Sequence, residues 1–188
     1  MPASTAAAPP APSSPPDAAA FRTVLGRVPT AVGVVTAVTP EGPVGVTVGS
    51  FTSVSLDPPL VVFYCGLHSA TAAALVEAGE FCVNVLSEQQ EHVCAAFAGR
   101  SADRFSCCTW RPAENGAPRL DGAVAWIECR VEDSFPAGDH LAVVGRIQRL
   151  TATTGPENPL VFHRGRLTRL DHARDRHAPT QRFDWWDA

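Results

Sequence analysis

The sequence lacks lysine altogether. Its fifteen basic residues are all arginine, and with nineteen acidic residues the formal net charge is −4. The absence of lysine excludes a P-loop, a pyridoxal phosphate Schiff base and the lysine with which kinases hold ATP. A bound phosphate would therefore be held by arginine, hydroxyl and backbone N–H groups. The negative net charge also disfavours a nucleic-acid surface.

Other signals are absent as well. No run approaches the roughly 18 to 20 apolar residues of a membrane span, and residues 1–16 lack the charged and apolar parts of a secretory signal. We therefore expect a cytoplasmic protein without membrane contact. The six cysteines show no C-x-x-C spacing, and the adjacent Cys107 and Cys108 have no histidine nearby. We expect neither a disulfide framework nor a metal site. No G-x-G-x-x-G follows a strand, which argues against a Rossmann dinucleotide site.

Composition divides the chain into three parts. Residues 1–16 hold only Ala, Pro, Ser and Thr after the first Met, so we expect a disordered leader with nothing large to bury. Residues 17–170 carry enough apolar content for one core and are expected to form one domain. Residues 171–188 are rich in Arg, Asp and His and are expected to form a weakly structured tail.

Three short helices are expected. The first starts at the N-cap Asp17 and stops before Pro29, and its apolar stripe consists of Phe21, Val24, Leu25 and Val28. The second starts at the N-cap Ser69 and stops at Gly79. The third opens with a capping box from Ser87 to Gln90 and runs to about residue 98.

The remaining patterns favour strands joined by hairpins. Hairpins are expected over 31–50 and 123–150, the latter turning at "SFPAGDH", and single strands over 59–65 and 80–86. "PLVFH" and "RLTRL" complete the set as a short pair, whereas the segment from "DRF" to "APRLDG" reads as a polar connection. About six to eight strands linked mostly by hairpins favour an antiparallel barrel over a doubly wound sheet.

A run of hydroxyl side chains lies in "GVTVGSFTSVSLDPPLVVF", residues 45–63. It consists of Thr47, Ser50, Thr52, Ser53 and Ser55. The apolar positions change parity at Gly49, which predicts a bulge that turns hydroxyl and N–H groups to one side. Such an arrangement could hold an anion without lysine; the alternative is a solvated loop.

Two further motifs are candidates for ligand binding. Ser69 and Thr71 begin a helix whose free N–H groups attract a phosphate, although an ordinary cap explains them equally well. His140 ends "GDH" at a hairpin bend, where it could donate a hydrogen bond or a proton to a ligand, or simply complete a turn.

Several blocks together resemble a known family. "FRTVLGRVPTAVGVVTA", "GVTVGSFTSVSLDPPLVVF", "SATAAALVEAGEFCVNVL", "SEQQ…FAGRSADRF", "GDHLAVVGRI" and "PLVFHRGRL" are similar, in this order, to the flavin reductase domain of two-component flavin-dependent monooxygenases. The resemblance implies a mostly β fold, the antiparallel Greek-key split barrel that binds FMN, with two or three short peripheral helices. It also implies a homodimer that uses NADH or NADPH to reduce FMN or FAD for a separate monooxygenase.

The resemblance also implies the site residues. His140 is the catalytic candidate beside the nicotinamide. The cofactor-binding candidates are Pro29, Thr30, Thr36, Thr47, Val48, Gly49, Ser50, Thr52, Ser53, Ser69, Thr71, Asn84, Val85, Phe105, His163, Arg164 and Gly165. Family members often carry Gly at the position of Ala31 and an aromatic residue at that of Leu167, so this chain departs from the pattern at both.

The residues and the resemblance together predict an NAD(P)H:flavin oxidoreductase. Two alternatives stay open at this point. One is a split-barrel protein that holds flavin without turnover, and the other is a flavin-dependent oxidase that acts directly on an organic substrate.

Overall fold

The computed structural model describes residues 17–99, 103–155 and 158–170. The helices are α1 (Ala18–Leu25), α2 (Ala70–Ala78) and α3 (Glu91–Ala98), with a short 3-10 helix η1 (Phe105–Cys107). The strands are β1 (Thr30–Ala31), β2 (Gly33–Thr39), β3 (Gly42–Val48), β4 (Thr52–Leu56), β5 (Pro59–Gly66), β6 (Glu80–Val85), β7 (Trp110–Pro112), β8 (Pro118–Leu120), β9 (Ala125–Ala137), β10 (His140–Ala152), β11 (Val161–His163) and β12 (Arg166–Thr168).

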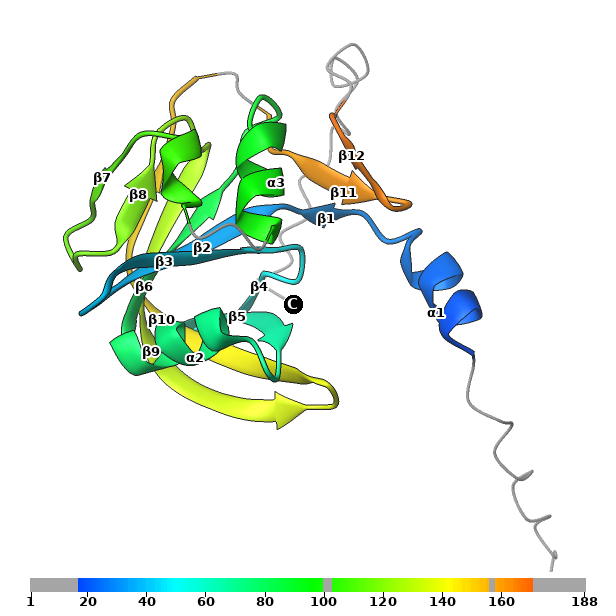
Figure 1. Ribbon diagram of the computed structural model, residues 1–188, viewed down its shortest axis with the longest axis horizontal. Coiled ribbons are helices and arrows are strands. Elements are labelled where there is room, and N and C mark those ends of the chain that lie inside the picture. Colours follow the sequence, from blue (N-terminus) through cyan, green and yellow to red (C-terminus); the bar gives the residue numbers. More distant parts are fainter. Residues whose placement is uncertain (1–16, 100–102, 156–157, 171–188) are drawn as a thin grey trace, which may run out of the picture.

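Seven strands form one curved sheet in the order β3-β2-β6-β9-β10-β5-β4 (Figure 1). Each pair of neighbours is antiparallel. The two edge strands, β3 and β4, follow one another along the chain and are joined by residues 49–51 alone. Because three residues span only about 10 Å, the sheet must curl until its two edges meet. The expected mostly β, antiparallel architecture is confirmed.

Two smaller sheets lie outside the barrel. β1 pairs with β11, and β11 pairs with β12, so the chain just before the barrel joins the chain just after it. β7 and β8 form a two-stranded ladder. Figure 1 shows α1 extending away from the barrel on the side of β1.

The barrel core contains helix side chains as well as strand side chains. Ala72 and Leu75 of α2 are buried among side chains of the strands. Ser69 caps this helix by accepting a hydrogen bond from Ala72 N at 3.2 Å, and Gly79 ends it with a left-handed φ of 74°. The predicted second helix is confirmed, and it fixes the position of Ser69 and Thr71, the "SAT" motif of residues 69–71, at the barrel.

The other two predicted helices are present but differ in detail. Asp17 caps α1 as expected, but the helix ends at Leu25, and its apolar stripe is exposed rather than packed on the barrel. In α3 the capping box is half formed, because Gln90 Oε1 accepts a hydrogen bond from Ser87 N at 3.0 Å while the helix begins only at Glu91. None of the described helices has the length and apolar character needed to cross a membrane.

Three strand predictions are corrected by the structure. β3 stops at Val48, and the predicted bulge at Gly49 is wrong; the register shift lies in the next strand, between Ser53 and Ser55. The turn of the long hairpin is only Gly138 and Asp139, because β9 continues to Ala137. The segment expected to be a polar connection contains β7 and β8.

Candidate functional site

The hydroxyl segment links the two edges of the barrel. Ser50 Oγ accepts a hydrogen bond from Tyr64 N at 3.0 Å and donates one to Tyr64 O at 3.1 Å. Its side chain therefore replaces a strand partner for β5. Next to it, a Cβ at Gly49 would lie 3.2 Å from Thr30 Oγ1, so only glycine lets β1 approach this closely without displacement. The Ser50 side chain therefore has a structural role at the junction between residues 49–51 and β5.

The other hydroxyl groups of the run have different surroundings. Thr47 Oγ1 donates to Cys94 O of α3 at 2.9 Å. Thr52 and Ser53 are exposed at the start of β4, and Thr52 makes only a long 3.4 Å contact with Ser53 O. Thr52 and Ser53 are thus the members of the run most accessible to a ligand.

The "GDH" and "SAT" motifs are neighbours in the structure. His140 pairs with Gly66 at the end of β5, and Leu67 N donates to Asp139 O at 3.0 Å. Ser69 N in turn donates to Gly66 O at 2.9 Å. Two motifs about 70 residues apart in sequence therefore meet at one end of β5, the same strand that Ser50 binds.

The histidine of this pair is half exposed. Its Nδ1 lies 2.6 Å from Asp139 Oδ1, and this hydrogen bond lowers the pKa of the Asp139 carboxyl group below its ordinary value. A carboxylate bound at Nδ1 orients the ring and leaves Nε2 for another partner. His140 has the exposure and orientation that a ligand-binding histidine needs.

Arg104 joins this end of the barrel, and the sequence reasoning gave it no role. Its Nη1 donates to Gly45 O of β3 at 2.7 Å and lies 3.4 Å from Thr71 Oγ1 at the start of α2. Its Nε is buried without a hydrogen-bond partner. A guanidinium with an unused donor beside a helix N-terminus fits a bound oxyanion. The available signal was an arginine in the block "FAGRSADRF" of a chain without lysine.

Thr36 and Asn84 lie in the interior of the protein, away from the surface. Both are fully buried, with no surface for a ligand. Asn84 Nδ2 donates to Val34 O and to Thr36 Oγ1, each at 3.0 Å, and Asn84 Oδ1 accepts from Leu120 N at 2.7 Å. Thr36 Oγ1 donates to Pro118 O at 2.6 Å. These two side chains hold β8 against the barrel.

The remaining candidates near the barrel fall into two places. Val48 and Val85 both pair with Gly33, so they lie on either side of β2 at the end where β3 stops. Phe105 instead packs edge-on against Phe97 and Trp110, with ring centroids 4.9 and 5.8 Å away. Phe105 belongs to the cluster around α3, and the described contacts do not bring it to His140.

A separate group is formed by Pro29, Thr30 and the β11–β12 hairpin, which carries His163, Arg164 and Gly165. Thr30 pairs with Phe162 across β1 and β11. Arg164 and Gly165 make the β11–β12 turn with φ values of 53° and 75°, and Arg164 N donates to Gly26 O at 2.8 Å. The turn is thereby fastened to the end of α1. No described contact joins it to His140, so Thr30, beside Gly49, is the link between the two groups.

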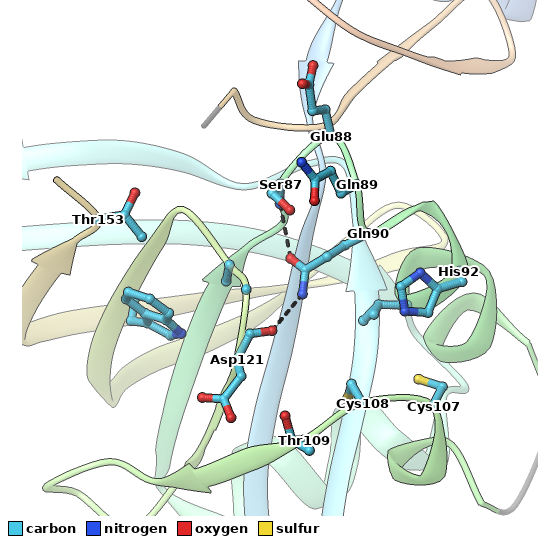
Figure 2. A pocket seen from close by; sticks show the side chains of 14 residues that line it. Ser87, Glu88, Gln89, Gln90, His92, Cys107, Cys108, Thr109, Asp121 and Thr153 are labelled. Carbon is cyan, nitrogen blue, oxygen red and sulfur yellow. Dashed lines mark hydrogen bonds between the residues drawn. The ribbon is translucent and has the colours of Figure 1, made fainter. Parts of the chain in front are cut away.

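One hollow of the surface is lined by none of the candidate catalytic or cofactor-binding residues. It measures about 480 Å³ and lies between the start of α3, η1 and the β8–β9 connection. Figure 2 shows Gln90 crossing it, with its Nε2 donating to Asp121 O at 2.9 Å and its Oε1 bound to Ser87 N. A second hollow of about 450 Å³ is lined in part by Arg164 and Gly165.

The family is decided by comparison with known proteins. The model of the flavin reductase like domain matches residues 25–171. The chain belongs to the flavin reductase family. A flavin reductase from Pseudomonas putida is 47% identical over 146 residues, which cover 77% of this chain and 85% of that protein.

Two solved structures of the flavin reductase family are similar throughout. Nitrilotriacetate monooxygenase component B from Mycobacterium thermoresistibile superposes with a TM-score of 0.82 at 40% identity, covering 89% of this chain and 93% of that one. The NADH:FAD oxidoreductase SgcE6 from Streptomyces globisporus, in complex with NAD and FAD fragments, superposes with a TM-score of 0.79 at 37% identity. The match covers 83% of this chain and 94% of that one.

These similarities confirm the family, the split-barrel fold and the expectation of an NAD(P)H-dependent flavin reductase that uses FMN or FAD. The two residues that depart from the flavin reductase pattern, Ala31 and Leu167, lie in different surroundings. Ala31 is exposed on β1, and Leu167 packs against the cluster around α3.

Proposed function

We propose that this chain reduces FMN or FAD with NADH or NADPH and passes the reduced flavin to a separate monooxygenase. The observation that carries the proposal is the meeting of His140 with the N-terminus of α2 across Gly66. It places a half-exposed histidine and a phosphate-attracting helix end on one side of the barrel. Family membership supports the same activity.

The residues at this end of the barrel fit a flavin phosphate. Thr71, the free N–H groups of α2 and the unpaired Nε of Arg104 would hold it, with Thr52 and Ser53 as further donors. Because the chain has no lysine, Arg104 is the cation described at this position. The polar network of Thr36 and Asn84 supports the strands behind the site.

The isoalloxazine end of the flavin would lie where β3 stops. Val48, Gly49 and Thr30 come together there, and the missing side chain at Gly49 leaves the backbone accessible. Flavin and nicotinamide supply the hydride chemistry when bound, so the protein contributes mainly position. His140, held by Asp139, would orient the nicotinamide through its Nε2.

We also propose that the protein works as a homodimer. α1 has no buried residue, although it carries the large apolar side chains Phe21, Val24 and Leu25, and the exposed Val28 follows its end. A helix of eight residues is marginal in water unless its apolar face is packed. A second copy of the chain would cover that face.

The proposed activity is tested by mixing the flavin-loaded protein with NADH, and separately with NADPH, without oxygen. Bleaching of the oxidised flavin spectrum by either is expected. Persistence of that spectrum with both would sink the proposal and favour a flavin-binding protein. Oxygen uptake with an organic substrate and no NAD(P)H would favour an oxidase.

The role of His140 is tested in the same assay. His140→Ala is expected to raise the KM for the reduced nicotinamide about tenfold, while the exposed His92→Ala serves as a matched control and should leave it unchanged. Equal effects of the two variants would remove His140 from the site.

A further inference from the structure

Arginines without partners gather at one corner of the molecule. Eleven arginines lie in the described residues, and six of them form an ion pair or hydrogen bond through the side chain. The five described arginines whose side chains have no such partner are Arg22, Arg27, Arg130, Arg164 and Arg166. Four of these five lie in α1, just after it, or in the β11–β12 hairpin.

The corner is hollowed. A depression of about 450 Å³ lies between α1 and the β11–β12 turn, lined by Arg22, Thr23, Gly26, Arg27, Arg164 and Gly165. Its volume falls within the range of small-molecule sites, roughly 300 to 1,000 Å³. A concave surface of this size suits a small ligand better than the flat face of a protein partner.

The geometry of the corner is fixed. Arg164 N donates to Gly26 O at 2.8 Å, which holds the turn against the end of α1. Around α1 the successive residues are 100° apart, so Arg22 and Thr23 lie outside the apolar stripe, and Arg27 follows the helix, which ends at Leu25. The hollow therefore stays open when another molecule covers that stripe.

The charge of the corner is strongly positive. The C-terminal end of a helix contributes about −0.5 charge, and three guanidinium groups outweigh it several times. No carboxylate of the described residues forms an ion pair with Arg22, Arg27 or Arg164. The site has the chemistry of an anion receptor with more than one phosphate-sized contact.

The corner is also connected to the proposed flavin site. Gly49 touches Thr30, Thr30 pairs with Phe162, and Arg164 follows two residues later. One strand spacing and two residues along a strand place Arg164 roughly 10 to 15 Å from Gly49. A ligand held at Gly49 would have to span this distance to reach the corner.

We propose that the hollow between α1 and the β11–β12 turn binds the phosphate groups of a dinucleotide through Arg22, Arg27 and Arg164. The anion is the pyrophosphate, or the 2′-phosphate of NADPH. The inference rests on the proposed function, because the reaction brings a nicotinamide dinucleotide, and FAD where that is the flavin, to this side of the barrel.

The test compares the full-length protein with the triple variant Arg22→Gln, Arg27→Gln, Arg164→Gln. The matched control is Arg130→Gln, which removes an unpaired arginine from β9, far along the barrel sheet. Titration calorimetry with ADP is the readout independent of activity. The triple variant should bind ADP at least about tenfold more weakly, and Arg130→Gln should bind it as the native protein does.

Salt supplies a second readout. Raising NaCl from about 0.05 to 0.5 M should weaken ADP binding to the native protein and much less so to the triple variant. Melting temperatures of all variants should agree with that of the native protein, since the backbone bond to Gly26 is kept. Unchanged ADP affinity in a folded triple variant, or no ADP binding by the native protein, would overturn the inference.

Two kinetic arms identify the source of the phosphate. A KM that rises for NADH or NADPH, but not for reduced nicotinamide mononucleotide, assigns the corner to the nicotinamide substrate. A loss of affinity for FAD without a loss for FMN assigns it to the flavin. If dinucleotides and mononucleotides weaken equally, the inference is wrong. ADP binding that depends on the arginines in a native protein that cannot reduce flavin would instead leave the corner standing and reject only the proposed function.

Discussion

At the scale of single residues, Ser50 decides how the barrel closes. Its hydroxyl group binds both the N–H and the C=O of Tyr64, so it acts as one rung of a ladder between the connecting segment and β5. A hydroxyl group engaged in this way has one lone pair left for a ligand. A mainly structural role for Ser50 therefore follows.

Ser50→Ala is expected to destabilise the protein by about 1 kcal/mol, because two exposed hydrogen bonds are lost at the seam. It should weaken FMN and riboflavin binding to the same degree. Ser53→Ala, which removes an exposed hydroxyl group, serves as the comparison and should leave the urea midpoint unchanged. A selective loss of FMN binding in Ser50→Ala, with unchanged stability, would return Ser50 to the phosphate site.

Arg104 is the residue whose charge we expect to matter most for the phosphate. Arg104→Gln removes the cation beside Thr71 and the donor to Gly45 O. FMN should bind about tenfold more weakly, since a charge-assisted hydrogen bond is lost, whereas riboflavin, which has no phosphate, should bind within about twofold of its native affinity. Fluorescence quenching titrations measure both constants. Equal losses for the two flavins would place the phosphate elsewhere.

At the scale of elements, local patterns predicted the parts and long-range contacts decided their partners. Asp17, Ser69 and Gly79 marked helix ends correctly because capping depends on neighbouring residues alone. β1 was not separable from the hairpin, because its partner β11 lies about 130 residues away and two residues carry no periodicity. β7 and β8 were missed for the same reason of length.

Among the candidate site residues, too, long-range contacts decide which side chains are exposed. Ser69, Thr71 and His140 lie at one end of β5, since β5 and β10 pair in register. Thr36 and Asn84 look alike in sequence to exposed polar residues of a strand, but the ladder β7–β8 covers them. Their burial depends on an element that sequence reading had taken for a polar connection.

The packing of β10 against β6 depends on one glycine. A Cβ at Gly145 would lie 2.3 Å from Phe81 Cζ and 3.1 Å from Cys129 Cβ, so the ring of a fully buried phenylalanine would have to move. Gly145→Ala is expected to destabilise the barrel by about 2 kcal/mol through overpacking. Gly66→Ala is the control, because nothing lies within 4 Å of its Cβ position. Similar urea midpoints for the two variants would contradict this account of the core.

At the scale of the whole molecule, buried thiols couple stability to pH. Burial raises the pKa of Cys65 from 9.0 to about 11 and that of Cys82 to about 12. Below pH 9 both thiols are neutral in the folded and the unfolded chain, so they contribute no pH dependence. Above pH 9 the unfolded chain loses these protons first, and folding becomes less favourable as pH rises towards 11 and 12.

The expected loss is about 1 kcal/mol per buried thiol at pH 10 relative to pH 8. Urea denaturation at the two pH values measures it. The double variant Cys65→Ala, Cys82→Ala should be less stable at both values because of the cavities, but its difference between pH 8 and pH 10 should shrink. A pH dependence equal to that of the native protein would show that other groups cause it.

The exposed apolar face of α1 is a candidate contact surface between two copies of the chain. Phe21 and Val24 are 56% and 61% exposed, and an eight-residue helix gains little stability from its own hydrogen bonds. If a second copy covers this face, removing the two apolar side chains should weaken the dimer. Phe21→Ser, Val24→Ser should shift sedimentation from the proposed dimer towards the monomer at micromolar concentration.

The control for this variant is Val38→Ser, which removes another exposed valine, 47% accessible, from β2. It should sediment as the native protein does, because a single exposed side chain on the barrel has no apolar neighbours along a helix stripe. A double variant that remains as dimeric as the control would show that α1 does not carry the contact. Since neither Phe21 nor Val24 lines the hollow between α1 and the β11–β12 turn, the same variant should keep the affinity of the native protein for ADP. Dimer formation and nucleotide binding can then be separated by mutation.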